Sequence, residues 1–315
     1  MRIINKFRQQ GGKNKFNWQH LLMVGVGISS IGYAGCCVYL YLNQGRMLYA
    51  PRRDLYRLPN DPKIRLRYEE LLIPVKDREN LHGWWLPAPT ASEPPALPLE
   101  PSKILKSPKV LLLFYGRGGN KSSVLFRLQA LHQLGFSILV VDYRGFGASG
   151  GNFPTERQIY ADAELAWQYL TKSRQINPGD IAIYGESMGG AVAIDLASKH
   201  PDAFALIAQS TFTNMSDAAR QNSSLRWFPI ELLLTDRFSS IEKVPNLKMP
   251  VLFIHGTSDA IVEVAMSERL YQAAPAPKQL YLVPGGGHIA IYQPESSYLR
   301  AISQFITRSH PRTSR

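Results

Sequence analysis

Cysteine is scarce in this sequence, which has 315 residues and only two cysteines, Cys36 and Cys37. Both lie near the N-terminus, so the rest of the chain has no means of forming a disulfide, a thiol nucleophile or a cysteine-ligated zinc site. Acidic residues are also scarce at that end, because residues 1–60 contain nine Lys and Arg but one acid, Asp54. Most of the net charge of +12 therefore lies there, and the nearly neutral remainder shows no basic surface or motif for nucleic acid.

Charged residues are absent from residues 16–45, which enclose an apolar run over 21–42. A helix of 22 residues rises roughly 33 Å, enough to cross a hydrocarbon core about 30 Å thick. Aromatic residues, which favour the membrane interface, lie at both edges of the run: Trp18, Tyr39 and Tyr41. These features predict a single-pass transmembrane helix.

Other interpretations of this run stay open. It could be a buried core helix or the apolar part of a cleavable signal peptide, and residues 33–36 (Tyr-Ala-Gly-Cys) differ by one residue from a lipoprotein processing site. A slight excess of basic residues before the run favours a catalytic domain on the non-cytoplasmic side. A stripe of small residues would let two helices pair as a homodimer, or is the ordinary glycine and serine content of a membrane helix. The stripe comprises Gly25, Ser29, Gly32 and Cys36.

Composition divides the chain into five parts. They are a basic N-terminal segment (1–20), the anchor (21–42), a basic stalk (43–60), a globular domain (61–308) and a tail (309–315). Two segments interrupt the domain: a proline-rich loop (88–109) and an apolar insertion that we interpret as a lid (211–248).

Short apolar runs alternate with helical patterns along the domain. This alternation predicts an α/β fold in which helices cover both faces of a mostly parallel sheet. The expected strands are 65–73, 81–86, 110–114, 137–141, 181–184, 205–208, 251–254 and 279–283. The expected helices are 121–134, 155–172, 188–199, 263–273 and 291–307.

The motif Gly-x-Ser-x-Gly, which marks a nucleophile elbow, occurs twice. In the first copy Asn152 and Pro154 follow Ser149 too closely for a helix to begin, so we interpret that copy as a turn. In the second copy Ser187 stands between an expected strand and an expected helix, although a glycine-rich turn into a helix would look similar. Ser187 is therefore the candidate nucleophile.

A serine nucleophile needs a base, and the base needs an acid to orient it. Of the seven histidines, His288 is the one on a loop after the last expected strand, while His255 ends a strand and is expected to shape a loop. Asp259 follows the strand before. The order Ser187, Asp259, His288 is that of α/β hydrolases, and we expect all three to meet at the carboxyl edge of the sheet.

Two backbone N–H groups are expected to bind the oxyanion. One belongs to Met188, directly after the nucleophile, and the other to Arg117, in the loop after the strand 110–114. The Arg117 side chain either points into the cleft, where it would favour an anionic substrate group, or is a solvated loop arginine.

Together these motifs resemble the membrane-anchored α/β-hydrolase-domain proteins of the bud-emergence and serine-aminopeptidase-like branch. The resemblance covers about residues 47–306 and rests on segments 48–51 (Leu-Tyr-Ala-Pro), 142–149 (Asp-Tyr-Arg-Gly-Phe-Gly-Ala-Ser), 185–189, 255–259 and 286–288. It implies a serine hydrolase without metal or organic cofactor that acts on an ester, thioester or amide. By the same likeness, Asp142 and Arg144 are architectural.

Two departures from the family pattern concern the site. Tyr115-Gly116-Arg117 replaces the usual His-Gly-Asn, which changes the oxyanion loop, and Ile289-Ala290 replaces the Asn-Asp that often follows the histidine. The second change removes side chains that would hydrogen-bond behind the histidine.

The expected function is hydrolysis of carboxylic ester or thioester bonds in acyl or lipid-like substrates. The anchor would hold the site near membrane lipids, and the apolar insertion offers room for an acyl chain. Amide or peptide hydrolysis is the alternative, as is a non-catalytic membrane-anchored scaffold. The expected partners are the substrate, membrane lipids through the anchor and a second copy of the chain through the transmembrane helix, and we expect no nucleic acid.

Overall fold

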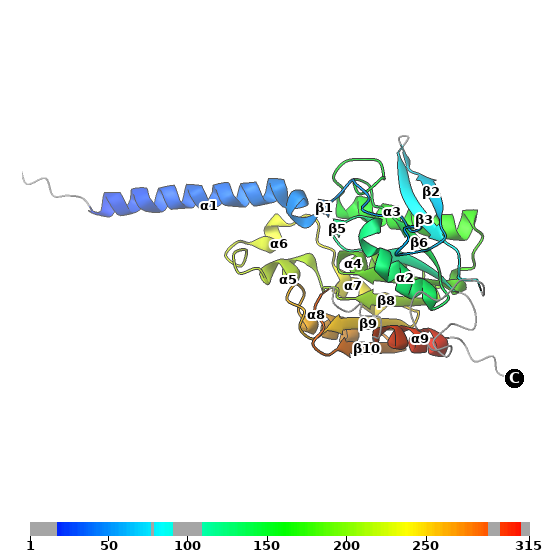
Figure 1. Cartoon of the computed structure of the whole chain (residues 1–315). Helices are drawn as coiled ribbons and strands as arrows, with labels where there is room; N and C mark the ends of the chain where they lie inside the picture. Colours follow the sequence, from blue (N-terminus) through cyan, green and yellow to red (C-terminus); the bar gives the residue numbers. More distant parts are fainter. Residues whose placement is uncertain (1–17, 77–78, 91–108, 289–296, 310–315) are drawn as a thin grey trace, which may run out of the picture. The chain divides into compact units, whose positions relative to one another are not determined.

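The computed structural model describes residues 18–76, 79–90, 109–288 and 297–309. The chain divides into two units, residues 1–43 and 44–315. The first contains most of helix α1 (Trp18–Leu48), drawn in blue in Figure 1. The segment Leu22–Leu48 is long and apolar enough to cross a membrane, and none of its most apolar window is buried. This exposure argues against the interpretation as a core helix.

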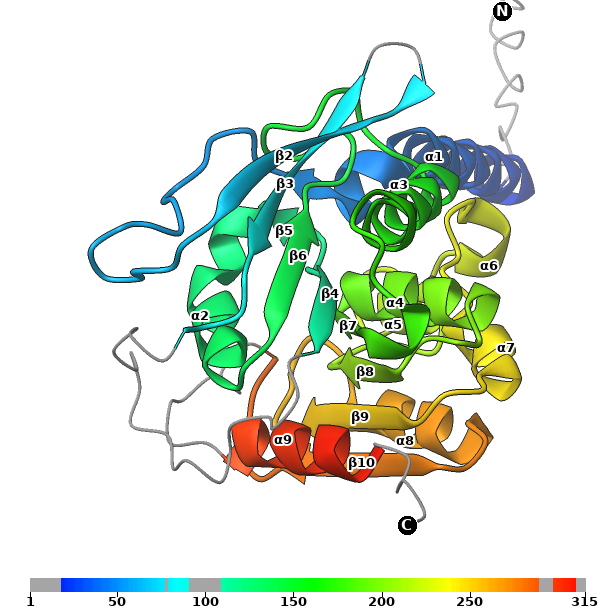
Figure 2. The ribbon, with the colours of Figure 1, turned by 90° about the vertical axis from the view of Figure 1, so that its right-hand side faces the viewer.

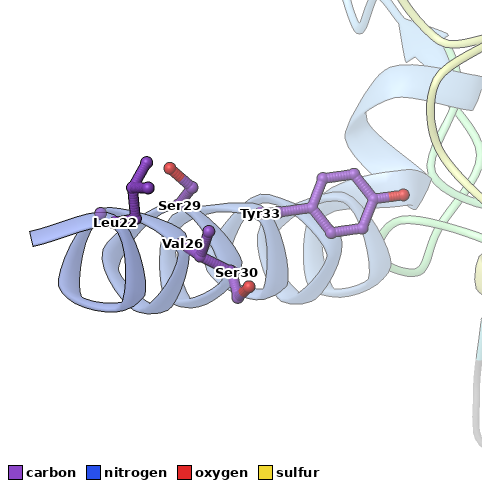
Figure 3. Close-up of a pocket in the computed structure, with 6 residues that line it drawn as sticks. Leu22, Val26, Ser29, Ser30 and Tyr33 are labelled. Atoms are coloured by element: carbon purple, nitrogen blue, oxygen red, sulfur yellow. The ribbon is translucent and has the colours of Figure 1, made fainter. Parts of the chain in front are cut away.

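A groove runs along one face of α1. Figure 3 shows the side chains that border it, and the lining residues are Leu22, Gly25, Val26, Ser29, Ser30 and Tyr33. Gly25 and Ser29 belong to the stripe of small residues that the sequence singled out. The pairing of two helices along that stripe stays a prediction.

Within the described residues, an eight-stranded sheet forms the centre of the second unit (Figure 2). Its spatial order is β10-β9-β8-β7-β4-β6-β3-β2, in which β2 and β3 run antiparallel to their neighbours and all other pairs are parallel. The strands are β2 (Glu69–Pro74), β3 (Asn80–Leu86), β4 (Val110–Phe114), β6 (Ser137–Val141), β7 (Ile181–Glu186), β8 (Ala205–Gln209), β9 (Val251–Gly256) and β10 (Lys278–Val283).

Helices cover both faces of the sheet, as Figure 2 shows. They are α2 (Leu125–Gln133), α3 (Glu156–Gln168), α4 (Met188–Lys199), α8 (Val264–Ala273) and α9 (Ser297–Ser309). Every residue of β4, β7, β8 and β9 is buried, which explains their continuous apolar runs. This architecture confirms the predicted α/β-hydrolase fold.

Several predicted boundaries shift. The first predicted strand corresponds to β2 and begins at Glu69 rather than at residue 65, and α3 ends at Gln168, after which Tyr169–Ser173 form a π-helical turn. Most of the proline-rich loop, the start of the last predicted helix and almost all of the tail lie outside the described residues.

Of the segment interpreted as a stalk (43–60), residues 44–60 belong to the same unit as the domain and do not stand apart from it. Leu48 and Tyr49 are buried, and strand β1 (Ala50–Pro51) pairs in parallel with β5 (Gly118–Gly119). The sequence prediction of a solvated stalk relied on the basic residues of the segment and overlooked the apolar ones. The last residues of α1, from Gln44 on, therefore already belong to the domain.

The insertion interpreted as a lid (211–248) is helical. It contains α5 (Met215–Arg220), α6 (Ile230–Leu233), α7 (Ser240–Lys243) and the 3-10 turn η6 (Val244–Asn246). Part of it completes the core, since Phe238 and Val244 are fully buried, whereas Trp227 and Leu232 face solvent.

Candidate active site

Ser187 occupies the sharp turn between β7 and α4. Its φ of 54° and ψ of −123° lie in a region that residues with a side chain rarely adopt. The flanking glycines permit this turn: a Cβ on Gly185 would lie 2.0 Å from the Gly189 carbonyl oxygen, and one on Gly189 would lie 2.2 Å from that of Phe114. The glycines of the motif are thus required by close backbone packing, and the turn lifts the serine above the sheet.

Asp259 and His288 form a hydrogen-bonded pair after β9 and β10. The Asp259 Oδ2 atom lies 2.7 Å from His288 Nδ1 and 3.1 Å from His255 Nε2, and the carboxylate is fully buried. Its Oδ1 atom accepts the N–H groups of Ile261 and Val262 at 2.8 and 3.0 Å. Burial raises the pKa of Asp259, but the hydrogen bonds outweigh burial and hold that pKa well below its ordinary value.

His255 shapes the loop that carries the acid. Its Nε2 atom lies 2.9 Å from the Val262 carbonyl oxygen, and because a carbonyl only accepts, this nitrogen carries a hydrogen. The Nδ1 atom lies 2.6 Å from the Ser267 hydroxyl. The ring is fully buried, so it has no access to substrate and instead joins Asp259 and its loop to Ser267 of α8. This placement agrees with the loop-shaping role expected from the sequence.

The topology brings Ser187 to the same edge of the sheet as the acid–histidine pair. Strands β7, β8, β9 and β10 are parallel neighbours, so their carboxyl ends lie side by side. With Nδ1 of His288 directed at Asp259, Nε2 is the nitrogen left to receive a proton. Within the described residues no hydrogen bond joins Ser187 to His288. Such bonds are often long in unliganded enzymes and tighten when substrate binds.

The predicted oxyanion donors flank the nucleophile. Met188 is the first residue of α4, where an N–H has no partner within the helix. The loop of Arg117 approaches from β4: a Cβ on Gly116 would lie 3.3 Å from the Ser187 Cβ. The Arg117 N–H makes no hydrogen bond in the described part of the chain. The use of these two N–H groups as oxyanion donors stays a prediction.

The Arg117 side chain contacts the protein backbone, which argues against its binding an anionic group of the substrate. Its guanidinium donates to the Met47 carbonyl oxygen at 3.1 Å, and its own carbonyl oxygen accepts the Ala50 N–H at 3.1 Å. The oxyanion loop is therefore held by the segment from Met47, at the end of α1, to Ala50. The sequence left open whether this arginine meets an anionic substrate group, and its contact with Met47 favours a positioning role.

Further contacts between residues 49–54 and the rest of the domain were missed by sequence reasoning. The Tyr49 hydroxyl donates to Asp236 at 2.7 Å, and burial raises the pKa of Tyr49 well above its ordinary value. The Asn120 amide donates to the carbonyl oxygens of Arg52 and Asp54 at 3.1 and 2.7 Å. The sequence offered one indication of these contacts, the Leu-Tyr-Ala-Pro segment (48–51), which the family resemblance includes but to which we assigned no role.

Ser149, in the other copy of the motif, is buried, and its hydroxyl both donates and accepts a hydrogen bond. Its hydroxyl donates to the Asp142 carbonyl oxygen at 2.6 Å and accepts the His82 N–H at 2.8 Å. The Asp142 carboxylate forms a buried ion pair with Lys121 and accepts the Tyr115 hydroxyl at 3.0 Å. This serine thus belongs to a structural turn, as the sequence indicated.

Arg144 and Asp162 brace the same turn. The Arg144 Nε atom and N–H both donate to the Asp162 carboxylate, each at 2.7 Å. Burial raises the pKa of Asp162 to about 6, although the hydrogen bonds from Arg144 lower it. The geometry supports the architectural role given to Asp142 and Arg144.

Among the described residues, no group of three or more His, Cys, Asp or Glu side chains is placed to hold a metal ion. The groups that the structure places at this edge of the sheet are a serine, an imidazole and a carboxylate, with two backbone N–H groups as predicted oxyanion donors. This combination suits nucleophilic acyl transfer.

Comparisons with known proteins agree with this class. Residues 122–308 match the prolyl oligopeptidase family. The chain is 34% identical over 263 residues to the uncharacterized protein Rv2307c of Mycobacterium tuberculosis, covering 84% of this chain and 86% of that protein. It is 32% identical over 177 residues to alpha/beta hydrolase domain-containing protein 17C of Mus musculus, covering 56% and 52% of the two chains.

Solved structures show the same fold. An esterase of Pyrococcus furiosus, Pf2001, superposes with a TM-score of 0.61 at 19% identity and covers 83% of this chain and 98% of its own. A puromycin-hydrolyzing peptidase of Mycobacterium tuberculosis has a TM-score of 0.60 at 20% identity and covers 82% and 41%. Fold and site define an α/β hydrolase. Within that class, the chain belongs to the prolyl oligopeptidase family.

Proposed function

We propose that this chain is a membrane-anchored serine hydrolase that cleaves ester or thioester bonds of acyl substrates. The observation that carries the proposal is the hydrogen bond of 2.7 Å between Asp259 and His288 at the sheet edge where Ser187 occupies a strained turn. A buried carboxylate that orients an imidazole, at the sheet edge where a half-buried serine occupies a strained turn, is the machinery of acyl transfer.

The first half-reaction forms an acyl-enzyme. The Ser187 oxygen attacks the acyl carbon while His288 Nε2 takes its proton, and Asp259 stabilises the imidazolium through Nδ1. The N–H groups of Met188 and Arg117 hydrogen-bond the oxyanion of the tetrahedral intermediate. The intermediate collapses, the bond to the alcohol or thiol breaks, and His288 returns the proton to the leaving group.

The second half-reaction releases the acid. Water gives a proton to His288 and attacks the acyl carbon, with the same two N–H groups holding the oxyanion. The bond to Ser187 breaks, the serine oxygen regains the proton from His288, and the free carboxylic acid departs.

The preference for acyl or lipid-like substrates is supported by α1, which is long and apolar enough to anchor the domain beside lipids. The bud-emergence branch of the α/β hydrolases, which the motifs resemble, has this organisation. We place the catalytic domain on the non-cytoplasmic side, from the basic residues that flank the span. Labelling of intact against permeabilised cells with a membrane-impermeant fluorophosphonate tests that side.

Amide or peptide hydrolysis is the second candidate, and one observation favours it: the family that the chain matches is named for an oligopeptidase. Purified protein assayed against a series of acyl esters and thioesters and against aminoacyl amides separates the two. Higher kcat/KM for the esters supports the proposal, and higher values for the amides support the alternative.

The reaction itself is tested with a fluorophosphonate probe on the full chain in detergent. We expect labelling of the wild-type protein and of Ser149→Ala, and none of Ser187→Ala. If no form reacts while all unfold cooperatively, the chain is a scaffold with a hydrolase fold. If Ser187→Ala still reacts, the nucleophile is another residue.

A further inference from the structure

Two large apolar side chains of the lid insertion face solvent. Trp227, in the loop between α5 and α6, is 71% exposed, and Leu232, on α6, is 82% exposed. The remainder of the insertion buries comparable side chains, among them Ile230 and Phe238. Exposed apolar side chains that lie close together in the chain, on an element that otherwise packs well, mark a surface that contacts a partner.

The position of α6 identifies that partner. Gln44 belongs to the same unit as the domain, and its Nε2 atom donates to the Leu233 carbonyl oxygen at 3.2 Å. Its Oε1 atom accepts the Thr235 N–H at 2.8 Å and the Thr235 hydroxyl at 3.0 Å. The residue after Leu232 is therefore fixed to the chain just beyond the apolar run.

Chain connectivity limits how far this contact lies from a membrane surface. The apolar run ends at residue 42, and Gln44 follows two residues later, so at most about 7 Å of chain separates them. If α1 crosses a bilayer, the headgroup region lies around Gln44. Leu232, which adjoins the residue that Gln44 holds, must then lie at or near that region.

The chemistry of the exposed residues fits a lipid surface. Tryptophan is enriched at membrane interfaces because its ring is apolar and its N–H is polar. The Arg226 guanidinium lies 5.1 Å from the centre of the Trp227 ring, which places a positive charge next to the apolar surface. Lipid phosphate groups would pair with this charge while the ring and Leu232 enter the acyl boundary.

The same insertion touches the catalytic acid loop at its other end. Asp217 on α5 pairs with Arg269 of α8 at 3.1 Å. The hydrogen-bond partners of the Gln221 amide determine which of its two atoms is nitrogen and which is oxygen. In that orientation the nitrogen donates to the Ile261 carbonyl oxygen at 2.8 Å, and the oxygen accepts the Glu263 N–H at 3.0 Å. The insertion thus joins the end of α1 to the loop that carries Asp259.

We propose that the exposed apolar residues of the α5–α6 region, Trp227 and Leu232, are a docking surface for the lipid bilayer that α1 crosses. This inference rests on the membrane anchoring proposed above. The bilayer is the partner that chain connectivity places beside α6. Docking would turn the lid insertion and the acid loop toward the lipid, from which an acyl substrate would enter.

The test uses the full chain reconstituted in phosphatidylcholine vesicles. In a background without Cys36 and Cys37 (both changed to Ser), one cysteine is placed by Leu232→Cys and labelled with an environment-sensitive fluorophore. The matched control is Leu72→Cys, because Leu72 is 64% exposed and lies on β2, away from α6 in Figures 1 and 2. A third sample keeps Cys36 alone and reports on the anchor. Each variant is first required to unfold cooperatively.

Quenching by lipids that carry a doxyl group near the headgroup is then measured. We expect the label at position 232 to lose about half of its emission, since interfacial residues lie roughly 5–10 Å inside the headgroup boundary. The label at position 72 should lose almost none. Equal quenching at 232 and 72 with strong quenching at Cys36 overturns the docking surface and leaves the anchor standing. Absence of quenching at Cys36 overturns the anchor, and the docking surface with it.

Discussion

The two Gly-x-Ser-x-Gly turns of this chain hold their serines in different ways. The Ser149 hydroxyl is buried and has two hydrogen-bond partners, the Asp142 carbonyl oxygen and the His82 N–H. The Ser187 hydroxyl makes no hydrogen bond within the described residues and sits on a turn with φ of 54°. A reactive serine therefore needs a position at a strand end that leaves its oxygen free, and the motif alone does not provide that position.

Ser187→Ala should have the largest effect on activity. Removing the nucleophile of a serine hydrolase lowers kcat by roughly 10⁴–10⁶-fold, because the acyl-enzyme no longer forms. The turn keeps its glycines, so the melting temperature should stay near that of the wild type. Steady-state hydrolysis of an acyl ester measures kcat, and thermal unfolding measures the melting temperature. A kcat within tenfold of the wild-type value would show that Ser187 is not the reactive serine of the two turns.

Asp259→Asn should lower kcat by roughly 10⁴-fold, as the loss of the triad acid does where it orients the histidine. An amide no longer stabilises the imidazolium and favours the wrong tautomer of His288. The same assay measures the effect. A loss of less than tenfold would show that His288 is oriented by something other than this carboxylate.

Arg117→Pro should lower kcat by roughly 10²–10³-fold, the usual effect of removing one oxyanion donor. The matched control is Arg117→Ala, which keeps the N–H and loses only the contact with Met47, so its kcat should stay within a few-fold of wild type. Equal losses in the two variants would assign the effect to the side chain instead of the N–H.

Ser149→Ala should change stability and leave the chemistry intact. The variant strands a buried carbonyl oxygen and a buried N–H, which costs about 1–3 kcal/mol of unfolding free energy. Denaturant unfolding measures this loss, and the rate of fluorophosphonate labelling should match that of the wild type. A variant of unchanged stability but lost labelling would reverse the assignment of the two turns.

Asp162→Asn should remove a pH dependence from the stability of the fold. The folded-state pKa of Asp162, about 6, exceeds the unfolded value of 3.8, so the folded form binds a proton that the unfolded form has lost between these pH values. The stability this group contributes is complete below pH 3.8 and is lost as the pH rises through about 6, up to about 3 kcal/mol. Melting temperatures of wild type and variant, measured across this pH window, should converge at its acid end. A difference between the two proteins that is the same at every pH would contradict the raised pKa of Asp162.

The position of the three candidate residues at one edge of the parallel sheet was predictable from the sequence, whereas their joint role in catalysis stays a prediction. The carboxyl ends of parallel strands share an edge, so locating β7, β9 and β10 was enough to place Ser187, Asp259 and His288 there. Ser149 was assigned to a turn because Pro154 follows too soon for a helix. Each of these inferences used residues within a few positions of one another.

Contacts between distant segments were not predictable. The strands β1 and β5 have two residues each, which is too short for any periodicity, and their pairing joins positions 50 and 118. The Tyr49–Asp236 hydrogen bond joins two polar residues with no motif between them. Lys121 is fully buried against Asp142, whereas a lysine in a sequence ordinarily indicates exposed surface.

The most direct test of the catalytic assignment is to locate the fluorophosphonate adduct by peptide mass spectrometry in wild type and in His288→Ala. We expect the wild-type adduct on the peptide of Ser187 alone and its loss in the variant, because an unactivated hydroxyl does not react. An adduct on Ser149, or undiminished labelling of Ser187 without the imidazole, would contradict the assignment.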